Sequence, residues 1–352
     1  MGHNELRRDY LLDRWVVIAT ERSRRPTDFI KQKSPHVAEN KACPLCPGNE
    51  RMTPPAIMVY LSGEDEIRVD KDENGFRHSN WLIRCIPNLY PAFTAPDEAL
   101  AHGWEEPSEG FGYAIGHHEV IVESPCHEEH PADASVPQLI LLVNAYLDRV
   151  RNLSAKSYVK YVSVFRNYGL EAGASLSHPH SQIITTPFVP RTVREEITAA
   201  ERFWHMHGKC VFCDIMAREI DGPRIVLADR YFTVVAPYAS VHPMEFWIIP
   251  RRHTANLLGL TEDEKRELAG TLKKSLKALK DTVGDPAYNF GFHFSTSRSD
   301  EEYYHWHLEV YPKLSVWAGF EKNTGMYINT VTPETAAAEL KKAIELAPQT
   351  SV

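Results

Sequence analysis

One pentapeptide pattern occurs twice in the chain, as His178-Pro179-His180-Ser181-Gln182 and as His305-Trp306-His307-Leu308-Glu309. Each copy ends the same ordered series, which contains a C-x-x-C pair, an apolar run that stops at a histidine, an amphipathic stretch and a second apolar run. The histidine that ends the first run lies 51 positions before the pattern in one series and 52 positions before it in the other. This agreement indicates a duplicated structural unit.

Residue type and periodicity predict the elements of each unit. Runs rich in β-branched and aromatic residues that stop at proline are typical of strands, and apolar residues at i, i+3, i+4 and i+7 are typical of helices. The first unit is predicted to have strands over 120–127 and 158–167 and a helix over 137–153, and the second to have strands over 246–253 and 288–295 and a helix over 261–279.

The sequence therefore predicts an α+β protein in which antiparallel sheets are flanked by helices. We place the boundary at residue 195, within a helical segment over 192–203, so that the halves are 1–195 and 196–352. Because no low-complexity linker separates them, we expect one body with pseudo-two-fold symmetry. Stretches 31–40 and 95–109, rich in proline and charge, are predicted to be surface loops.

Composition and charge narrow the possible functions. The 352 residues include 39 Lys and Arg against 47 Asp and Glu, and the net charge of −8 argues against nucleic acid or an anionic membrane as a partner. The chain starts without an apolar signal segment, and its densest apolar stretch, 139–143, is far shorter than the roughly 20 residues that cross a bilayer. These features predict a cytoplasmic protein that holds any anionic ligand through local groups.

Four of the six cysteines form the two C-x-x-C pairs, which in a reducing cytosol indicate metal or redox chemistry. A redox pair is the alternative, but Cys46 runs into a Pro-Gly-Asn turn where a thioredoxin-like motif needs a helix. Two thiolates alone do not hold a structural zinc, and the repeat offers the same two histidines to each pair. The predicted ligand sets for two zinc ions per chain are Cys43, Cys46, His127 and His178, and Cys210, Cys213, His253 and His305.

The first pentapeptide also predicts a reactive group. In an extended segment His178, His180 and Gln182 lie on one face, and Pro179 makes a helix unfavourable. With His178 committed to metal, His180 lies about 6.5 Å further along the strand and is available to react. The alternative is a surface histidine or one that only supports the metal. Gln182 and the preceding Gly-Ala-Ser segment add donors for an anion, which favours a reactive His180.

Together these residues resemble the galactose-1-phosphate uridylyltransferase family, the nucleotidyl-transferring branch of the histidine triad superfamily. The resemblance covers most of the chain and depends on the order of its motifs. The further motifs are Asp13 to Ile18 with Arg22 and Arg25-Pro26, Cys43-x-x-Cys46 with Gly48-Asn49, Ser124-Pro125-x-His127, Asn167, Gly173-x-Ser175 and Gly319-Phe320-Glu321. Asn88-Leu89-Tyr90-Pro91-Ala92 and the residues 173–178 are similar to a branch that includes plant ADP-glucose phosphorylase-like proteins.

The resemblance implies two tandem histidine-triad-like units and a ping-pong reaction. His180 would attack the α-phosphorus of a nucleotide sugar, and the resulting nucleotidyl-histidine would pass its group to a phosphate or sugar phosphate. Gln182 and Ser175 would stabilise charge on the phosphoryl oxygens. Arg22 and Arg25 would hold the sugar phosphate, across the interface of a homodimer. The other implied substrate contacts are Asn88, Tyr90, Asn167 and Gly173 around the nucleotide, and Phe320 and Glu321 near the hexose.

The second unit differs from the first. It keeps both cysteines, and Glu309 stands where enterobacterial members have a metal-binding histidine, so the resemblance favours a second zinc over iron. His307 corresponds to His180, but a carboxylate beside it would repel a phosphate. We therefore expect a structural and sugar-contacting role for the second half.

Four functions compete. The leading hypothesis is a uridylyltransferase that uses UDP-glucose and galactose 1-phosphate. The closest alternative is an ADP-glucose:phosphate adenylyltransferase, because base identity depends on the shape of the pocket and one sequence does not give that shape. A histidine triad hydrolase would leave Arg22, Arg25 and the Phe320-Glu321 motif without an acceptor to hold. A zinc-stabilised nucleotide-binding module without turnover would need no reactive histidine beside the metal.

Overall fold

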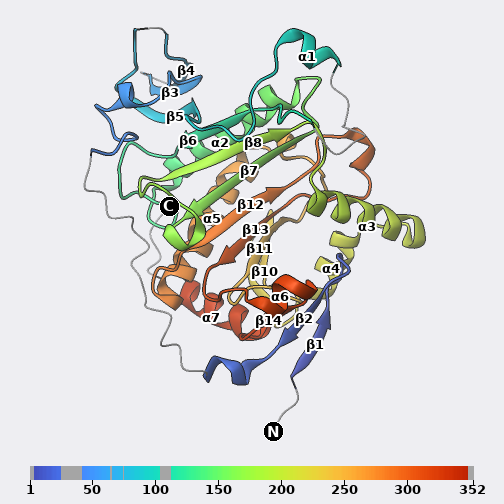
Figure 1. The fold of residues 1–352 in the computed structure, drawn as a ribbon. Helices are drawn as coiled ribbons and strands as arrows, with labels where there is room; N and C mark the ends of the chain where they lie inside the picture. The colour runs from blue at the N-terminus through green and yellow to red at the C-terminus, as the bar shows by residue number, and fades with distance from the viewer. Residues whose placement is uncertain (1–3, 25–41, 64–65, 74, 104–111, 348–352) are drawn as a thin grey trace.

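The computed structural model describes residues 4–24, 42–63, 66–73, 75–103 and 112–347. Eleven strands in this part of the chain form one antiparallel sheet with the order β4-β3-β5-β6-β8-β7-β12-β13-β11-β10-β9 (Figure 1). The strands from the first half are β3 (Met58–Ser62), β4 (Ile67–Asp70), β5 (Trp81–Pro87), β6 (His118–Val122), β7 (Tyr161–Tyr168) and β8 (His180–Thr186). Those from the second are β9 (Ile225–Ala228), β10 (Phe232–Val235), β11 (Phe246–Pro250), β12 (Tyr288–His293) and β13 (His307–Pro312).

The centre of the sheet is the junction between the two halves. β7 pairs with β12, and outward from this pair β8, β6 and β5 on one side match β13, β11 and β10 on the other. This mirrored order confirms the predicted α+β class and the tandem units. The predicted boundary at residue 195 falls within α3 (Arg191–His207), and the division into 1–195 and 196–352 stays a prediction.

Three helices cover one face of the sheet. They are α2 (Val136–Ser154), α5 (Glu262–Val283) and α7 (Pro333–Leu346). The helix predicted over 261–279 continues four residues further, to Val283. Gly284, with a left-handed φ of 78°, then ends it. At its start Thr261 accepts a hydrogen bond from the backbone N–H of Glu264, which forms a capping box.

The main core lies on the helix-covered face of the sheet, and predicted site residues lie on the opposite face. In β13, Leu308 and Val310 belong to the core, so that His307 and Glu309 lie on the other face. In β8, Ile183 is a core residue in the same way, and His180 and Gln182 face away from the helix layer.

Two predicted features differ from the structure. The strands predicted to reach the ligand histidines are shorter, since β6 ends at Val122 and β11 at Pro250. His127 and His253 therefore lie in loops, as expected where proline interrupts strand pairing. Within 95–109 the chain forms a short helix, α1 (Glu98–Gly103), while 31–40 lies outside the described residues.

A second, three-stranded sheet joins segments from both ends of the chain (Figure 1). β1 (Glu5–Arg8) is antiparallel to β2 (Trp15–Ile18), and β14 (Tyr327–Asn329) pairs in parallel with β2. The helices next to this sheet in sequence are the 3-10 turn η1 (Thr20–Arg24) and α6 (Gly319–Thr324). None of the helices in the described ranges has the length and apolarity that crossing a membrane requires.

Candidate active site and metal centres

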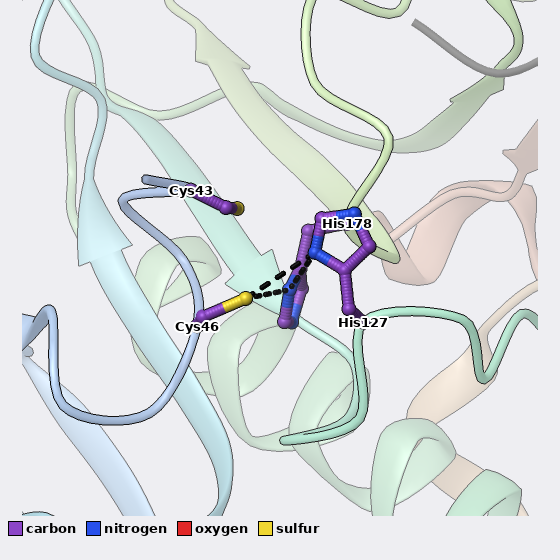
Figure 2. A group of neighbouring side chains, drawn as sticks. All are labelled: Cys43, Cys46, His127 and His178. Carbon is purple, nitrogen blue, oxygen red and sulfur yellow. Dashed lines mark hydrogen bonds between the residues drawn. The ribbon is translucent and has the colours of Figure 1, made fainter. Parts of the chain in front are cut away.

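The first cysteine pair and two histidines form a compact cluster (Figure 2). Cys46 Sγ lies 3.2 Å from His127 Nδ1 and 3.5 Å from His178 Nδ1, and the two Nδ1 atoms are 3.3 Å apart. Metal–sulfur and metal–nitrogen bonds of about 2.3 and 2.0 Å predict ligand separations of roughly 3.3–3.8 Å in a tetrahedral zinc site. Together with Cys43, whose sulfur lies within 4.8 Å of the other ligand atoms, these residues fit a bound zinc.

A backbone carbonyl orients the His178 imidazole for this role. His178 Nε2 donates to the carbonyl of Ser124 at 2.9 Å, which leaves Nδ1 with the lone pair that binds metal.

The second predicted ligand set forms an equivalent cluster. Its members are Cys210, Cys213, His253 and His305. Cys213 Sγ lies 3.4 and 3.5 Å from the Nδ1 atoms of His253 and His305. Their Nε2 atoms donate to the carbonyls of Glu301 at 2.7 Å and Pro250 at 2.8 Å. Both halves thus present Nδ1 to the metal position.

The backbone around the two cysteine pairs differs. The first pair lies in a turn, where the Cys46 amide donates to the Cys43 carbonyl. The second pair starts helix α4 (Val211–Glu219), with Cys210 as the N-cap. A hydrogen bond from Cys210, followed by those from the two imidazoles, lowers the pKa of Cys213 to about 3. The thiolate form is the one that binds metal.

A third cluster was not predicted. The ligand atoms of Glu196, His293, His307 and Glu309 lie within 4.8 Å of one another. Two imidazoles and two carboxylates also suit a divalent metal ion. The sequence analysis identified the two residues of β13 but missed Glu196 on α3 and His293 on β12, because isolated residues on different elements share no spacing.

Charge attraction dominates in this third cluster. Burial alone would raise the pKa of Glu196, but His293, whose Nδ1 lies 3.0 Å from a Glu196 oxygen, lowers it to about 2. Burial opposes the charged form of His293, and Glu196 and Glu309 nevertheless raise its pKa to about 9. His307 is 0% exposed and packs against Phe212 and Trp247, so aromatic side chains enclose its ring.

His180 lies at the start of β8 and lines a small cavity. Its Nδ1 donates to the carbonyl of His178 at 2.7 Å, which makes Nε2 the basic nitrogen. The other residues that line the cavity are His130, Arg166, Asn167, Tyr168, Gly169, Ala174, Leu176, Ser177 and His178. The predicted nucleophile, a predicted metal ligand and the predicted nucleotide contact Asn167 therefore meet in one cavity.

Gln182 contacts a residue that the sequence analysis missed. Its Oε1 lies 2.7 Å from His118 Nε2. The side-chain amide nitrogen of Asn88 lies 3.1 Å from His118 Nε2. The Asn88 side-chain oxygen accepts the backbone N–H of Tyr90 at 2.9 Å. The structure thus brings two predicted site residues, Asn88 and Gln182, together around His118. Tyr90 itself is 84% exposed.

The remaining predicted residues of the first half lie at the rim. Gly173 and Ser175 are both exposed and do not line the cavity that contains His180. Gly173 ends the 3-10 turn η3 (Leu170–Ala172) with a left-handed φ of 89°, close to Asn167. Asn167 Oδ1 accepts a hydrogen bond from Asn289 at 2.8 Å across the β7–β12 junction.

The predicted sugar-binding residues belong to a different region. Arg22 lies in η1 after β2, and Phe320 and Glu321 lie in α6 before β14, so the small sheet brings these distant segments onto one module. Phe320 is 45% exposed, and Glu321 accepts the backbone N–H of Ala318 at 2.9 Å. These residues do not line the cavity that contains His180. Arg25 lies outside the described residues.

Comparison with known proteins identifies the class. A family model described as "Domain of unknown function (DUF4921)" matches residues 140–350. ADP-glucose phosphorylase from Arabidopsis thaliana is 34% identical over 343 residues, which cover 96% of this chain and 92% of the relative. Galactose-1-phosphate uridylyltransferase from Thermotoga maritima is 28% identical over 353 residues, covering 96% of this chain and 98% of the relative.

Solved structures agree with these relatives. The crystal structure of the Arabidopsis thaliana ADP-glucose phosphorylase with bound ADP-glucose matches with a TM-score of 0.80 and 29% identity, over 99% of this chain and 100% of that chain. The fold and the relatives define a nucleotidyltransferase. The chain belongs to the family that contains ADP-glucose phosphorylase and the galactose-1-phosphate uridylyltransferases, which confirms the resemblance found in the sequence.

Proposed function

We propose that the protein transfers a nucleotidyl group through His180. The observation that carries this proposal is the 2.7 Å hydrogen bond from His180 Nδ1 to the His178 carbonyl, which makes Nε2 the nucleophilic nitrogen. Nε2 attacks the α-phosphorus of a nucleotide sugar, and the bond to the sugar 1-phosphate breaks as the new P–N bond forms. An acceptor phosphate oxygen then attacks the same phosphorus and releases neutral His180. Gln182 donates to the charged phosphoryl oxygens in both steps, and Ser175 is a second donor.

We propose ADP-glucose as the nucleotide sugar and phosphate as the acceptor, with ADP and glucose 1-phosphate as the products. The 34% identity to ADP-glucose phosphorylase, spread over nearly the full length of both chains, supports this donor. Transfer from UDP-glucose to galactose 1-phosphate is the second candidate, because uridylyltransferases also match over nearly the full chain. Asn88, Tyr90, Asn167 and Gly173 contact the nucleotide in either case.

We propose two structural zinc ions per chain, one in each Cys₂His₂ cluster. Four protein ligands close the coordination shell, so the metal contributes stability and positions its ligands. In the first half the zinc fixes His178 and therefore the strand that starts at His180. Thiolate sites of this kind persist in a reducing compartment, which supports a cytoplasmic location.

We propose that the active site is completed by a second copy of the chain. Arg22, Phe320 and Glu321 belong to the small-sheet module and do not line the cavity of their own chain, which supports a homodimer in which they reach the partner's nucleotide. Arg25 would act with them.

The donor is tested by incubation with ADP-glucose or UDP-glucose labelled at the α-phosphate. Acid-labile label on the protein from ADP-glucose, released as ADP by phosphate, is expected. Label only from UDP-glucose, released only by galactose 1-phosphate, would favour the second candidate. No covalent label from either donor, with metal-replete protein, would reject the mechanism.

The shared site is tested by mixing two inactive variants, Arg22→Ala and His180→Gly. If each active site uses both chains, mixed dimers contain one intact site, and co-expression recovers up to about a quarter of the wild-type activity. A fully active monomer, measured by light scattering at the assay concentration, contradicts the shared site.

A further inference from the structure

His118 is a half-buried histidine on β6 whose side chain contacts Gln182. It belongs neither to the metal clusters nor to the residues that line the cavity of His180. In the sheet, β6 pairs with β8, and Val120 is the direct partner of Gln182. His118, two residues earlier, lies on the same face as Gln182 and is its diagonal neighbour.

The backbone of His118 is fixed from both sides. Its carbonyl accepts the N–H of Asn88 at 2.8 Å, and the carbonyl of the preceding His117 accepts the N–H of Thr185 at 2.9 Å. The chain also passes so close to β8 that a Cβ atom on Gly116 would lie 2.2 Å from the carbonyl oxygen of Thr185. The side chain of His118 therefore starts from a rigid position.

The tautomer of His118 is set by the backbone. The N–H of Ala92 donates to His118 Nδ1 at 3.1 Å, so Nδ1 carries the lone pair and the proton is on Nε2. Nε2–H must donate, and its acceptor is Gln182 Oε1 at 2.7 Å. The nearby amide nitrogen of Asn88, 3.1 Å away, is itself a donor and cannot accept this proton.

This hydrogen bond determines which end of the Gln182 carboxamide faces the phosphoryl group. With Oε1 held by His118, the NH₂ group is the end that remains for donation on the face shared with His180. A rotated carboxamide would present its oxygen to a phosphoryl oxygen, and two acceptors repel. The His118 donor is therefore the group that selects the productive orientation.

The second half provides an internal comparison. By strand register Glu309 matches Gln182 and Trp247 matches Val120, so Glu245 matches His118. In that half both positions hold a carboxylate, which has no donor when ionised. The two positions thus differ together between the halves, as expected if they act as a pair.

We propose that His118 is a positioning residue for nucleotidyl transfer, which acts through Gln182 by fixing its amide orientation. This inference rests on the proposed function, since it assigns Gln182 its task. The inference adds that fast formation of the nucleotidyl-histidine requires a hydrogen-bond donor at the position of His118 Nε2.

The matched variants are His118→Gln, which keeps a donor near the position of Nε2, and His118→Met, which has a similar length and no donor. Single-turnover labelling of the protein by α-phosphate-labelled ADP-glucose, or by UDP-glucose if that is the active donor, measures the chemical step. We expect His118→Met to slow labelling about tenfold and His118→Gln to stay within about threefold of wild type, because one hydrogen bond of ordinary strength is lost or kept. The Kd for the nucleotide sugar and the Tm should be similar in both variants.

A Gln182→Ala background separates positioning from folding. There, His118→Met should add less than about twofold, because the carboxamide that it orients is gone. An equal additional loss in both backgrounds, or an equal loss for the Gln and Met variants, overturns the proposal. Absence of labelling in the wild type would instead reject the proposed function, so the two failures are distinguishable.

Discussion

The two halves of the chain share the order of their four inner strands and a Cys₂His₂ cluster, but the surroundings of the pentapeptide differ. In the first half His180 lines a cavity and lies beside Gln182. In the second half His307 is fully buried, and its strand continues with Glu309. The two halves therefore share a scaffold and differ in the side chains on one face of one strand. Under the proposed function these side chains decide which half accepts a phosphate.

The difference extends to charge. Around His307 the carboxyl groups of Glu196, Glu245 and Glu309 are buried. His293 is the cation beside Glu196 and Glu309, and Arg14 is the cation near Glu245 and Glu309. At the corresponding positions beside His180 stand His118 and Gln182, which contact each other. Under the proposed function an anionic substrate fits the arrangement around His180, and the carboxylates around His307 would repel it.

The largest expected effect comes from removing each histidine in turn. His180→Gly should lower the transfer rate by about 10⁴-fold or more, since the covalent nucleophile is lost. His307→Gly should leave the specific activity of the folded fraction within a few-fold of wild type. Activity assays and acid-labile labelling, with the metal content as control, distinguish the two. Loss of labelling only in His307→Gly would show that the active half was assigned wrongly.

Exchanging the residue two positions after each of these histidines, Gln182 or Glu309, sharpens the comparison. Gln182→Glu gives the first half the carboxylate of the second, and the loss of a donor together with charge repulsion should slow labelling roughly 10²–10³-fold. The reverse change, Glu309→Gln, should change the specific activity less than about fivefold. If Gln182→Glu were as active as wild type, charge would not be what separates the halves.

Each metal cluster can be removed separately. Cys46→Ser and Cys213→Ser should each lower the zinc content by one ion per chain, measured by elemental analysis of freshly purified protein. Both should lower the Tm by roughly 5–10 °C. Because His178 precedes His180, only Cys46→Ser should also slow labelling of the folded fraction, by about tenfold. Identical effects of both variants on labelling would contradict this division of roles.

The smallest expected effect is a pH dependence that comes from the second half. His242 is buried against Trp317, and burial, with Lys313 and Arg14 nearby, lowers its pKa to about 3. Between pH 6.5 and 3 the unfolded chain binds a proton that the folded chain does not, so stability falls as the pH falls, by about 2 kcal/mol at pH 5.

Replacement of this histidine tests the assignment. His242→Phe should reduce the difference between the unfolding free energies at pH 7 and pH 5 by that amount, measured by denaturant titration. The matched control is His205→Phe, since the His205 side chain is 74% exposed. An unchanged pH dependence in His242→Phe would show that another group titrates.

Local sequence determined the repeat, its helices and both Cys₂His₂ ligand sets. The reason is physical: C-x-x-C spacing places two thiols on one turn, H-x-H spacing places two histidines on one strand face, and amphipathic periodicity fixes which face of α2 and α5 is buried. A strand in this segment was predictable because Pro179 excludes a helix, although β8 begins only at His180 and His178 lies in the bend before it. The strand, helix and turn signals depend only on residues close in sequence, whereas the match of each cysteine pair to its histidines came from the repeat.

Tertiary structure alone decided the rest. The third cluster combines Glu196 from α3 with residues of β12 and β13, and the contact between His118 and Gln182 depends on the register of β6 and β8. The small sheet brings Arg22 to the same module as α6 and away from His180. Single residues on separate elements carry no periodicity, so only the pairing and packing of those elements determine what they touch.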